Sequence, residues 1–185
     1  RAEAPNQVLD LTVFETLGGD AEKNAALKLR FTAPGDDATL GTATRYDIRF
    51  AKFLFSAGMF EQATAMQNPP TPLPAGTRQE FMLSTLDVGA VYYVALKAQD
   101  DLSSWSNMSV IAVGLTPDKL APAAVADLQG STVPEQLGSI QVSFTSPGDD
   151  QQTGTARVYD LRWSLEAITA DNFTLATRAL VSLFP

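Results

Sequence analysis

The sequence has no cysteine and no histidine among its 185 residues. The missing thiols exclude disulfides and cysteine nucleophiles, and the missing imidazoles exclude the commonest general base and metal ligand. No apolar run approaches the roughly 20 residues of a membrane-spanning helix. Basic residues are few, 13 against 21 acidic ones, so the net charge is −8. Because this charge repels nucleic-acid phosphates, we expect no nucleic-acid partner. The lack of a long apolar run leads us to expect no membrane span.

The residue patterns that support catalysis are also scarce. Without histidine or cysteine, a serine or threonine nucleophile would need lysine or a carboxylate as its base, and none stands in a Gly-x-Ser-x-Gly turn. A carboxylate pair for glycoside hydrolysis needs a cleft and a defined separation. We therefore expect no enzymatic activity and no cofactor, apart from the calcium hypothesis discussed below.

The sequence does contain a repeat with a period of 113 residues. Phe-Thr-Ala-Pro-Gly-Asp-Asp at 31–37 returns as Phe-Thr-Ser-Pro-Gly-Asp-Asp at 144–150, and Tyr-Asp-Ile-Arg at 46–49 returns as Tyr-Asp-Leu-Arg at 159–162. Nearer the start of each copy the spacing is 117, because the first copy has four extra residues in an early loop. Such a period indicates tandem domains. We expect them at residues 1–117 and 118–185, joined by a short proline-containing linker with restricted bending.

Alternating hydrophobicity predicts short strands in both copies. The alternating stretches are residues 27–31, 46–50, 81–83 and 92–98 in the first copy, and 140–144 and 159–163 in the second. We expect a last strand over 110–113 and short helices only near 56–65 and 170–176. About seven short strands per complete copy are typical of a two-sheet antiparallel sandwich. The predicted fold class is therefore all-β, with immunoglobulin-like sandwiches in tandem.

The first copy resembles the fibronectin type III domain, in the bacterial form that has a Pro-Gly-Asp-Asp turn after the second strand. The similarity rests on that turn and on residues 86–98, LDVGAVYYVALKA, which look like the approach to the family's sixth strand. It implies that Tyr92 is the tyrosine-corner residue, whose hydroxyl bonds the backbone at the end of the sandwich. Phe31 and Phe144 replace the family's tryptophan, and Val88 replaces a proline, without changing the expected fold.

The second copy stops after about four predicted strands. About 43 residues of the period, which would form its last three strands, are not in the sequence. A half-sandwich of this size leaves its core open and buries too little surface to be stable alone. Three explanations are open: a longer polypeptide, a second chain that adds the strands, and a disordered half-domain. The apolar run Ala179–Phe184 argues against disorder, because such a run aggregates when unprotected.

Two pairs of aspartates are the metal-ligand candidates. Pro34-Gly35 fits the centre of a type II turn with positive φ at the glycine, which leaves Asp36 and Asp37 in the following loop. Asp100 and Asp101 lie in the loop before the last strand, and the resemblance implies that both loops reach the same end of the sandwich. Four converging carboxylates suit calcium. Alternatively, they accept backbone N–H groups and stiffen the loops, and the spacing of a calcium-binding loop is missing.

Two further features are candidates for binding. Trp105 lies in the loop before the last strand, where it would stack on a sugar or a protein or else anchor the loop. Pro69, Pro70 and Pro72 belong to a proline-dense segment that we expect to be extended and to cross from one sheet to the other. This segment is either a rigid crossover or a ligand for an aromatic groove on a partner.

These features predict a non-enzymatic spacer and protein-interaction module of a larger bacterial surface or secreted protein, with an extracellular or envelope location. Its partners would be other proteins, in adhesion or surface assembly, or neighbouring domains of the same polypeptide. The first residues lack a secretion signal's apolar core, so we expect any signal to have been removed. One alternative is a carbohydrate-binding accessory region of a secreted hydrolase. Another is a self-assembling subunit of a surface filament or envelope complex, completed by strand addition.

Overall fold

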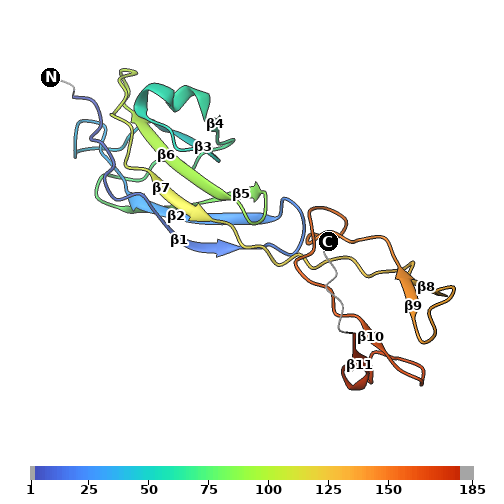
Figure 1. The fold of residues 1–185 in the computed structure, drawn as a ribbon. Helices are drawn as coiled ribbons and strands as arrows, with labels where there is room; N and C mark the ends of the chain where they lie inside the picture. Colours follow the sequence, from blue (N-terminus) through green and yellow to red (C-terminus); the bar gives the residue numbers. More distant parts are fainter. Residues whose placement is uncertain (1–2, 180–185) are drawn as a thin grey trace. The chain divides into compact units, whose positions relative to one another are not determined.

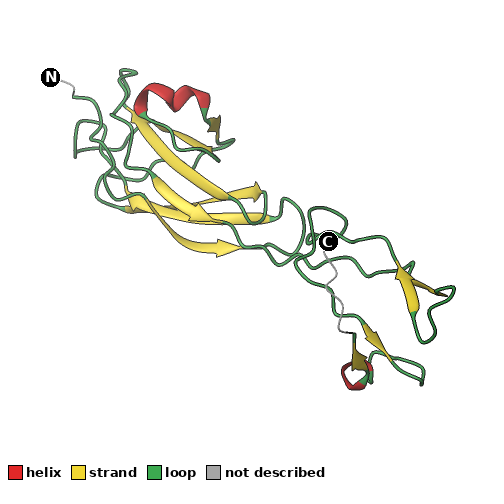
Figure 2. Ribbon diagram, in the orientation of Figure 1, coloured by secondary structure: helices red, strands yellow, loops and turns green. Residues whose placement is uncertain are grey.

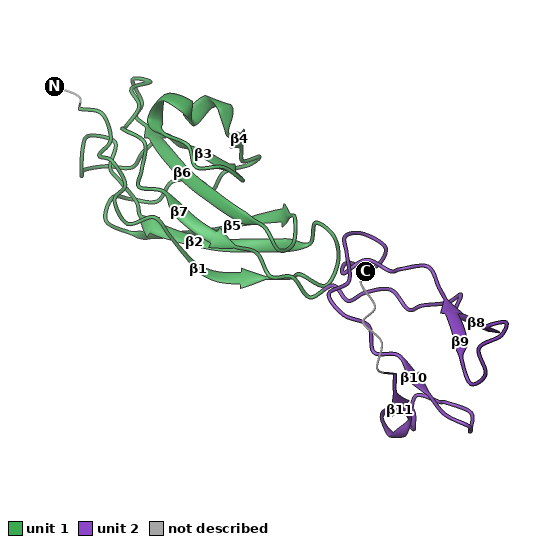
Figure 3. Cartoon of the chain, in the orientation of Figure 1, with its two compact units in different colours: residues 1–119 green, residues 120–185 purple. Residues whose placement is uncertain are grey.

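The computed structural model describes residues 3–179, in two compact units, residues 1–119 and 120–185 (Figure 1, Figure 3). Strands and loops make up nearly all of both units, and the described helices are two short 3-10 segments (Figure 2). The first of these, η1 (Ala57–Gln62), lies in the first unit, and η2 (Phe173–Leu175) lies in the second. Both fall within the ranges where the sequence predicts a short helix.

The first unit consists of two antiparallel sheets. The three-stranded sheet has the order β1 (Thr12–Leu17), β2 (Ala25–Thr32), β5 (Arg78–Leu86). The four-stranded sheet has the order β4 (Thr64–Ala65), β3 (Arg45–Ala51), β6 (Val91–Gln99), β7 (Ala112–Leu115). Consecutive strands change sheets three times, between β2 and β3, between β4 and β5, and between β5 and β6. This arrangement is an immunoglobulin-like β-sandwich.

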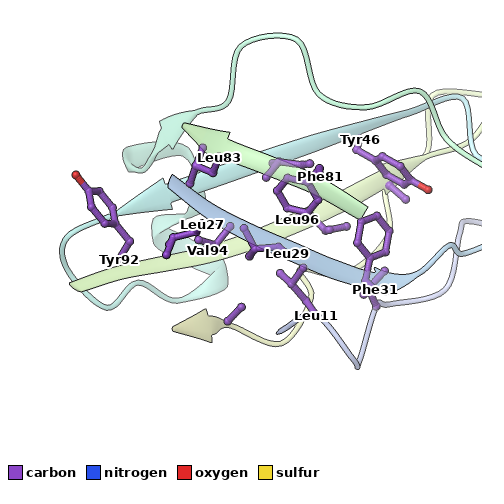
Figure 4. Close-up of a cluster of buried hydrophobic side chains, with 14 of the residues drawn as sticks. Leu11, Leu27, Leu29, Phe31, Tyr46, Phe81, Leu83, Tyr92, Val94 and Leu96 are labelled. Carbon is purple, nitrogen blue, oxygen red and sulfur yellow. The ribbon is translucent and has the colours of Figure 1, made fainter. Parts of the chain in front are cut away.

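The core lies between the two sheets and is built from the alternating residues seen in the sequence (Figure 4). Leu29 is paired with Phe81 across β2 and β5, and Ile48 with Leu96 across β3 and β6. Phe31 packs edge-on against Phe81, with ring centroids 6.2 Å apart. The alternation thus predicts correctly which side chains face inward, because successive side chains of a strand point to opposite faces.

Two local predictions are wrong. The last strand begins at Ala112 and not at 110, because the Val110 N–H donates to the Val8 carbonyl, 3.1 Å away, outside the sheet. Gly35 does not have the positive φ that a type II turn requires. The residue with a positive φ in this loop is Ala38, at 53°. Gly35 is required for space, because a Cβ there would lie 2.1 Å from the Leu40 carbonyl oxygen.

The residues after β7 are tied to the first unit. The Lys119 N–H donates to the Gly19 carbonyl at 2.7 Å, and the Thr116 hydroxyl donates to the Asp87 carbonyl at the same distance. Gly19 has φ 99°, and a Cβ there would lie 2.7 Å from the Pro117 carbonyl oxygen. Part of the segment expected to be a linker is therefore bound to the end of the sandwich.

The described part of the second unit holds four strands. β8 (Gln129–Thr132) pairs with β9 (Ile140–Ser143), and β10 (Arg162–Trp163) pairs with β11 (Thr177–Arg178). When the repeat spacing is applied, these four strands correspond to β1, β2, β3 and β4. The register of β10 with β11 agrees with that of β3 with β4, and the register of β8 with β9 agrees with that of β1 with β2 up to the irregularity after Val13. The chain is therefore all-β, with two immunoglobulin-like units in tandem. Most of the apolar run Ala179–Phe184 lies outside the described residues.

Candidate interaction sites

The two aspartate-bearing loops meet at one end of the first unit. The Asp36 Oδ1 accepts the Asp101 N–H at 3.1 Å, which joins the loop after β2 to the loop after β6. The Asp37 Oδ1 accepts the Glu3 N–H at 2.9 Å. Asp100 is buried, and its Oδ1 accepts two backbone N–H groups of its own loop, at 3.0 and 2.6 Å. Three of the four carboxylates thus hold backbone segments in place.

These hydrogen bonds are the ones expected if the aspartates accept backbone N–H groups and stiffen the loops, which was the alternative to calcium binding. Within residues 3–179, no group of three or more acidic side chains is arranged to hold a metal ion. Calcium binding by Asp36, Asp37, Asp100 and Asp101 stays a prediction. The two loops at this end of the sandwich are thus held in place by their own carboxylates.

Exposed apolar side chains project from these fixed loops. Leu40 and Leu102 belong to the first and second loop, respectively, and both are largely exposed. Trp105 ends the second loop and is 38% exposed. The Arg45 guanidinium lies 5.2 Å from the centroid of the Trp105 ring, close enough for a cation–π contact. We call the surface formed by Leu40, Leu102 and Trp105 the loop pole.

A shallow pocket of about 200 Å³ adjoins Trp105. Its lining includes the side chains of Arg45, Asp47 and Met66. The Arg45 Nε donates to the Gln99 Oε1 at 2.6 Å, which fixes the guanidinium beside the indole. An aromatic ring, a guanidinium and a carboxylate therefore surround one hollow.

The proline-dense segment crosses between the sheets, as the sequence predicts. Residues 66–77 contain no strand and connect β4 in one sheet to β5 in the other. Pro69 is exposed, whereas Pro70 and Pro72 are half-buried. The Leu73 N–H donates to the buried side chain of Gln79 at 3.0 Å, which anchors the end of the segment. Recognition of these prolines by a partner stays a prediction.

The sequence analysis did not identify a buried hydroxyl in the core of the first unit. The hydroxyl of Tyr46 has no hydrogen-bond partner among the described residues, and the nearby Leu73 N–H donates to Gln79 instead. Burial raises the pKa of Tyr46 to about 12, and the Leu73 N–H offsets part of this rise. In the second unit, the equivalent Tyr159 hydroxyl is hydrogen-bonded to Ser146. The first unit has Ala33 at the position of Ser146, which explains the missing partner.

An arginine contact shared by both units was also missed. The Arg49 Nη1 donates to the Glu61 and Ala63 carbonyls at 3.1 and 3.4 Å, and its guanidinium lies 5.3 Å from the Phe60 centroid. Asp47 holds the guanidinium from β3, at 3.0 Å. We call this arrangement the arginine clamp. It fixes η1 on the outer face of the four-stranded sheet, where Phe60 is fully buried.

The second unit repeats the clamp with its own residues. The Arg162 Nη1 donates to the Thr174 and Ala176 carbonyls at 2.8 and 3.2 Å, and its guanidinium lies 5.3 Å from the Phe173 centroid. The hydrogen bond from Arg162 lowers the pKa of Asp160. The sequence showed these residues as parts of the repeat, but nothing in their spacing indicated the contact.

The first unit has a tyrosine corner, which is a hallmark of immunoglobulin-like sandwiches. The Asp87 N–H donates to the Tyr92 hydroxyl at 3.1 Å, just before β6, as the resemblance implied. The fold of the first unit is fibronectin type III-like. The fibronectin type III-like unit has three strands in one sheet and four in the other, and its loop pole lies at the end where β6 finishes.

Comparisons with known proteins concern the fold. No family model matches the sequence, and no curated protein does. The structure matches 52 chains of solved structures. One of them is the crystal structure of the chicken CNTN1 FN1–FN3 domains, with a TM-score of 0.44 and 18% identity. That match covers 68% of this chain, which spans only 37% of the CNTN1 chain.

None of the helices within residues 3–179 is long and apolar enough to cross a membrane.

Proposed function

We propose that the protein is a non-catalytic spacer and protein-interaction segment of an extracellular or envelope-exposed protein, and that the first unit binds its partner through the loop pole. The observation that supports this proposal is the combination of fixed loops and exposed apolar side chains. Asp36 and Asp100 hold the two loops, and Leu40, Leu102 and Trp105 project from them.

Pre-organisation makes such a surface favourable for binding. Loops that are already ordered lose little conformational entropy when a partner binds, so more of the contact energy appears as affinity. Tryptophan and arginine dominate the energetics of many interfaces, and here Arg45 lies over Trp105. Asp37 and Asp101 are exposed beside the apolar residues, so the partner surface that fits best is apolar with a basic rim.

The test compares a loop-pole variant with a matched control. The variant carries Leu40→Ser, Leu102→Ser and Trp105→Ser; the control carries Leu54→Ser, which follows β3 at the other end of the sandwich. Leu54 and Leu102 are both 65% exposed, so the control loses one leucine that matches Leu102, one of the three residues lost in the variant. Each is immobilised and exposed to the surface and secreted proteins of the producing organism, and the bound proteins are quantified by mass spectrometry. We expect wild type and control to retain a common set that the loop-pole variant loses. Equal retention by all three would refute the proposal.

A second candidate function is carbohydrate binding, which the pocket beside Trp105 favours. Arg45 and Asp47 would hydrogen-bond sugar hydroxyls while the indole stacks on the ring. A glycan array probed with wild type and with Asp47→Asn tests this candidate. Binding that depends on Asp47 would support it, and a blank array would leave protein binding as the function.

A further inference from the structure

The outer face of the four-stranded sheet in the first unit is apolar beyond the part that η1 covers. The register places Leu115 opposite Val91 and Val113 opposite Tyr93, and these residues alternate with core residues of β6 and β7. Leu115 is 61% exposed, Val113 55% and Val91 41%, whereas Tyr93 is half-buried against the cluster around η1. Adjoining apolar side chains that are this exposed form a patch, which on a soluble protein commonly marks an interface.

Two residues of this patch also carry the open edge of the sheet. β7 is the last strand in the order β4-β3-β6-β7, and no strand within residues 3–179 pairs with its other side. The Thr116 N–H donates to the Ala90 carbonyl at 2.9 Å, so Thr116 faces β6. Successive residues of an antiparallel strand bond to opposite sides. Gly114 therefore also bonds to β6, whereas Val113 and Leu115 direct their N–H and C=O groups to the open edge.

This edge has none of the charges or bulges that prevent edge strands from pairing with other chains. The other three edges of the first unit are protected. β1 has Glu15 and a bulge after Val13, β5 has Arg78 and Glu80, and β4 is only two residues long. Residues 109–117, SVIAVGLTP, contain no charged residue, although the whole chain has a net charge of −8. The uncharged edge and the exposed apolar patch thus coincide in β7.

We propose that β7 pairs in antiparallel fashion with β7 of a second copy of the chain, so that two four-stranded sheets become one continuous sheet. The strand is self-complementary, because the open groups of Val113 meet those of Leu115 of the second copy when a two-fold axis passes through Gly114. This apolar pair occurs twice, and the two patches become continuous on one face. Such an isologous contact closes on itself, so association stops at the dimer.

The neighbouring residues select this register. A two-fold axis at Leu115 would place Val113 opposite Pro117, which has no N–H to donate. An axis at Val113 would bring the second copy against Val110, whose N–H already donates to the Val8 carbonyl at 3.1 Å. Only the axis at Gly114 uses the open groups of both residues and avoids both obstacles. The interface begins at the end of the sheet where Leu115 lies opposite Val91, the first residue of β6, whereas the loop pole lies where β6 finishes.

The first test measures the mass of the full chain by sedimentation equilibrium from micromolar to submillimolar concentration. The variant is Val113→Lys, and the matched control is Met82→Lys, at an apolar side chain that is 48% exposed on the edge strand β5. We expect wild type and control to form dimers as the concentration rises. Val113→Lys should weaken the dimer about tenfold or more, because it buries a charge in an apolar interface. Val113 is already exposed, so the variant should fold, which urea unfolding verifies.

A charge-swap experiment tests the register itself. Leu115→Glu should also weaken the dimer when measured alone. Mixed with Val113→Lys, it should form a heterodimer at least tenfold more stable than either variant's own dimer, because the register places the new lysine opposite the new glutamate. Hydrogen exchange locates the contact, since the amides of Val113 and Leu115 should gain protection as the wild-type chain is concentrated.

Three results would overturn the proposal: a wild-type chain that stays monomeric over the whole range, a Val113→Lys dimer as stable as that of wild type, or no gain on mixing the two charge variants. The second result would show that any dimer forms through another surface. The loop-pole variant should dimerise like wild type, so failure here leaves the capture experiment at the loop pole standing, and failure there leaves this proposal standing.

Discussion

The unpaired hydroxyl of Tyr46 leads to a prediction that runs against the usual expectation for a core substitution. We expect Tyr46→Phe to leave the first unit as stable as wild type or to stabilise it by about 1 kcal/mol. A buried hydroxyl without a partner costs about 1–3 kcal/mol, and removing it recovers this cost, less the few contacts that the oxygen makes. Tyr46 is only 3% exposed, so water does not satisfy the group from the surface.

The matched control is Tyr92→Phe, in the same sandwich. The Tyr92 hydroxyl accepts the Asp87 N–H at 3.1 Å and donates to the Asp87 Oδ2 at 3.5 Å, so its removal loses both hydrogen bonds and leaves the N–H donor unpaired. We expect a loss of about 1.5–2 kcal/mol in the free energy of unfolding. The two Tyr→Phe variants should therefore differ by about 2 kcal/mol or more, although the atoms removed are the same.

The assay is urea unfolding followed by tryptophan fluorescence. In a Trp163→Phe background the remaining tryptophan, Trp105, reports on the first unit alone; phenylalanine is the residue that the first unit has at the equivalent position, Phe50. The slope of the transition should be unchanged in both variants, so that shifts in midpoint report stability. A third variant, Ala33→Ser, should stabilise the unit by about 1 kcal/mol, because it supplies the partner that Tyr159 has in Ser146.

The pH dependence is an independent measure of the same group. Burial raises the pKa of Tyr46 from 10.0 to about 12, so the unfolded chain loses this proton first as the pH rises. The contribution to stability is complete below pH 10 and is lost between pH 10 and about 12, to a total of about 3 kcal/mol. Tyr46→Phe should lack this part of the decline. The reasoning is refuted if Tyr46→Phe destabilises the unit by as much as Tyr92→Phe.

Three further perturbations test other parts of the structure. Arg49→Met should lower the free energy of unfolding of the first unit by about 2 kcal/mol in urea, because it removes the donors of the clamp and keeps an apolar stem; a change below about 0.5 kcal/mol would contradict the clamp. Gly35→Ala should cost about 3 kcal/mol or more, since its Cβ would meet a carbonyl oxygen at 2.1 Å, whereas Gly58→Ala, with its nearest neighbour at 4.0 Å, should be nearly neutral. Equal effects of the two glycine variants would show that the loop gives way. Millimolar calcium should raise Tm by less than about 1 °C; a saturable rise of several degrees, abolished by Asp36→Asn, would instead establish the calcium site.

The strands were predictable because their signal is local. Leu27, Leu29 and Phe31 alternate with polar residues, and a half-buried strand is the one regular structure with that period. The start of β7 was misplaced by two residues, because the Val110 N–H bonds a residue about a hundred positions earlier, which no local pattern reveals. Gly35 was correctly recognised as a turn residue, but for the wrong reason, since the constraint is the space beside Leu40.

From the sequence, only the positions of the loops and of the repeated residues in the candidate sites could be predicted. The approach of Asp36 to Asp101 followed from the fold that the resemblance implied, and the structure joins the two loops by a hydrogen bond. The roles of these carboxylates in holding N–H groups depend on loop geometry that composition does not encode. Tyr46 and Ser146 show the limit of repeat-based inference, because a single difference between the copies, at Ala33, decides whether a buried hydroxyl is paired.

The arginine clamp has a consequence for tracing the ancestry of such domains. Both copies keep an aspartate, an arginine two residues later and a phenylalanine eleven residues after that, at positions 47, 49 and 60 and at 160, 162 and 173. Each member of this triplet makes a contact that fixes a turn on the outer face of a sheet, so the triplet can be retained while the rest of the sequence diverges. The triplet at this spacing is therefore a pattern with which further copies of this module can be sought in other sequences.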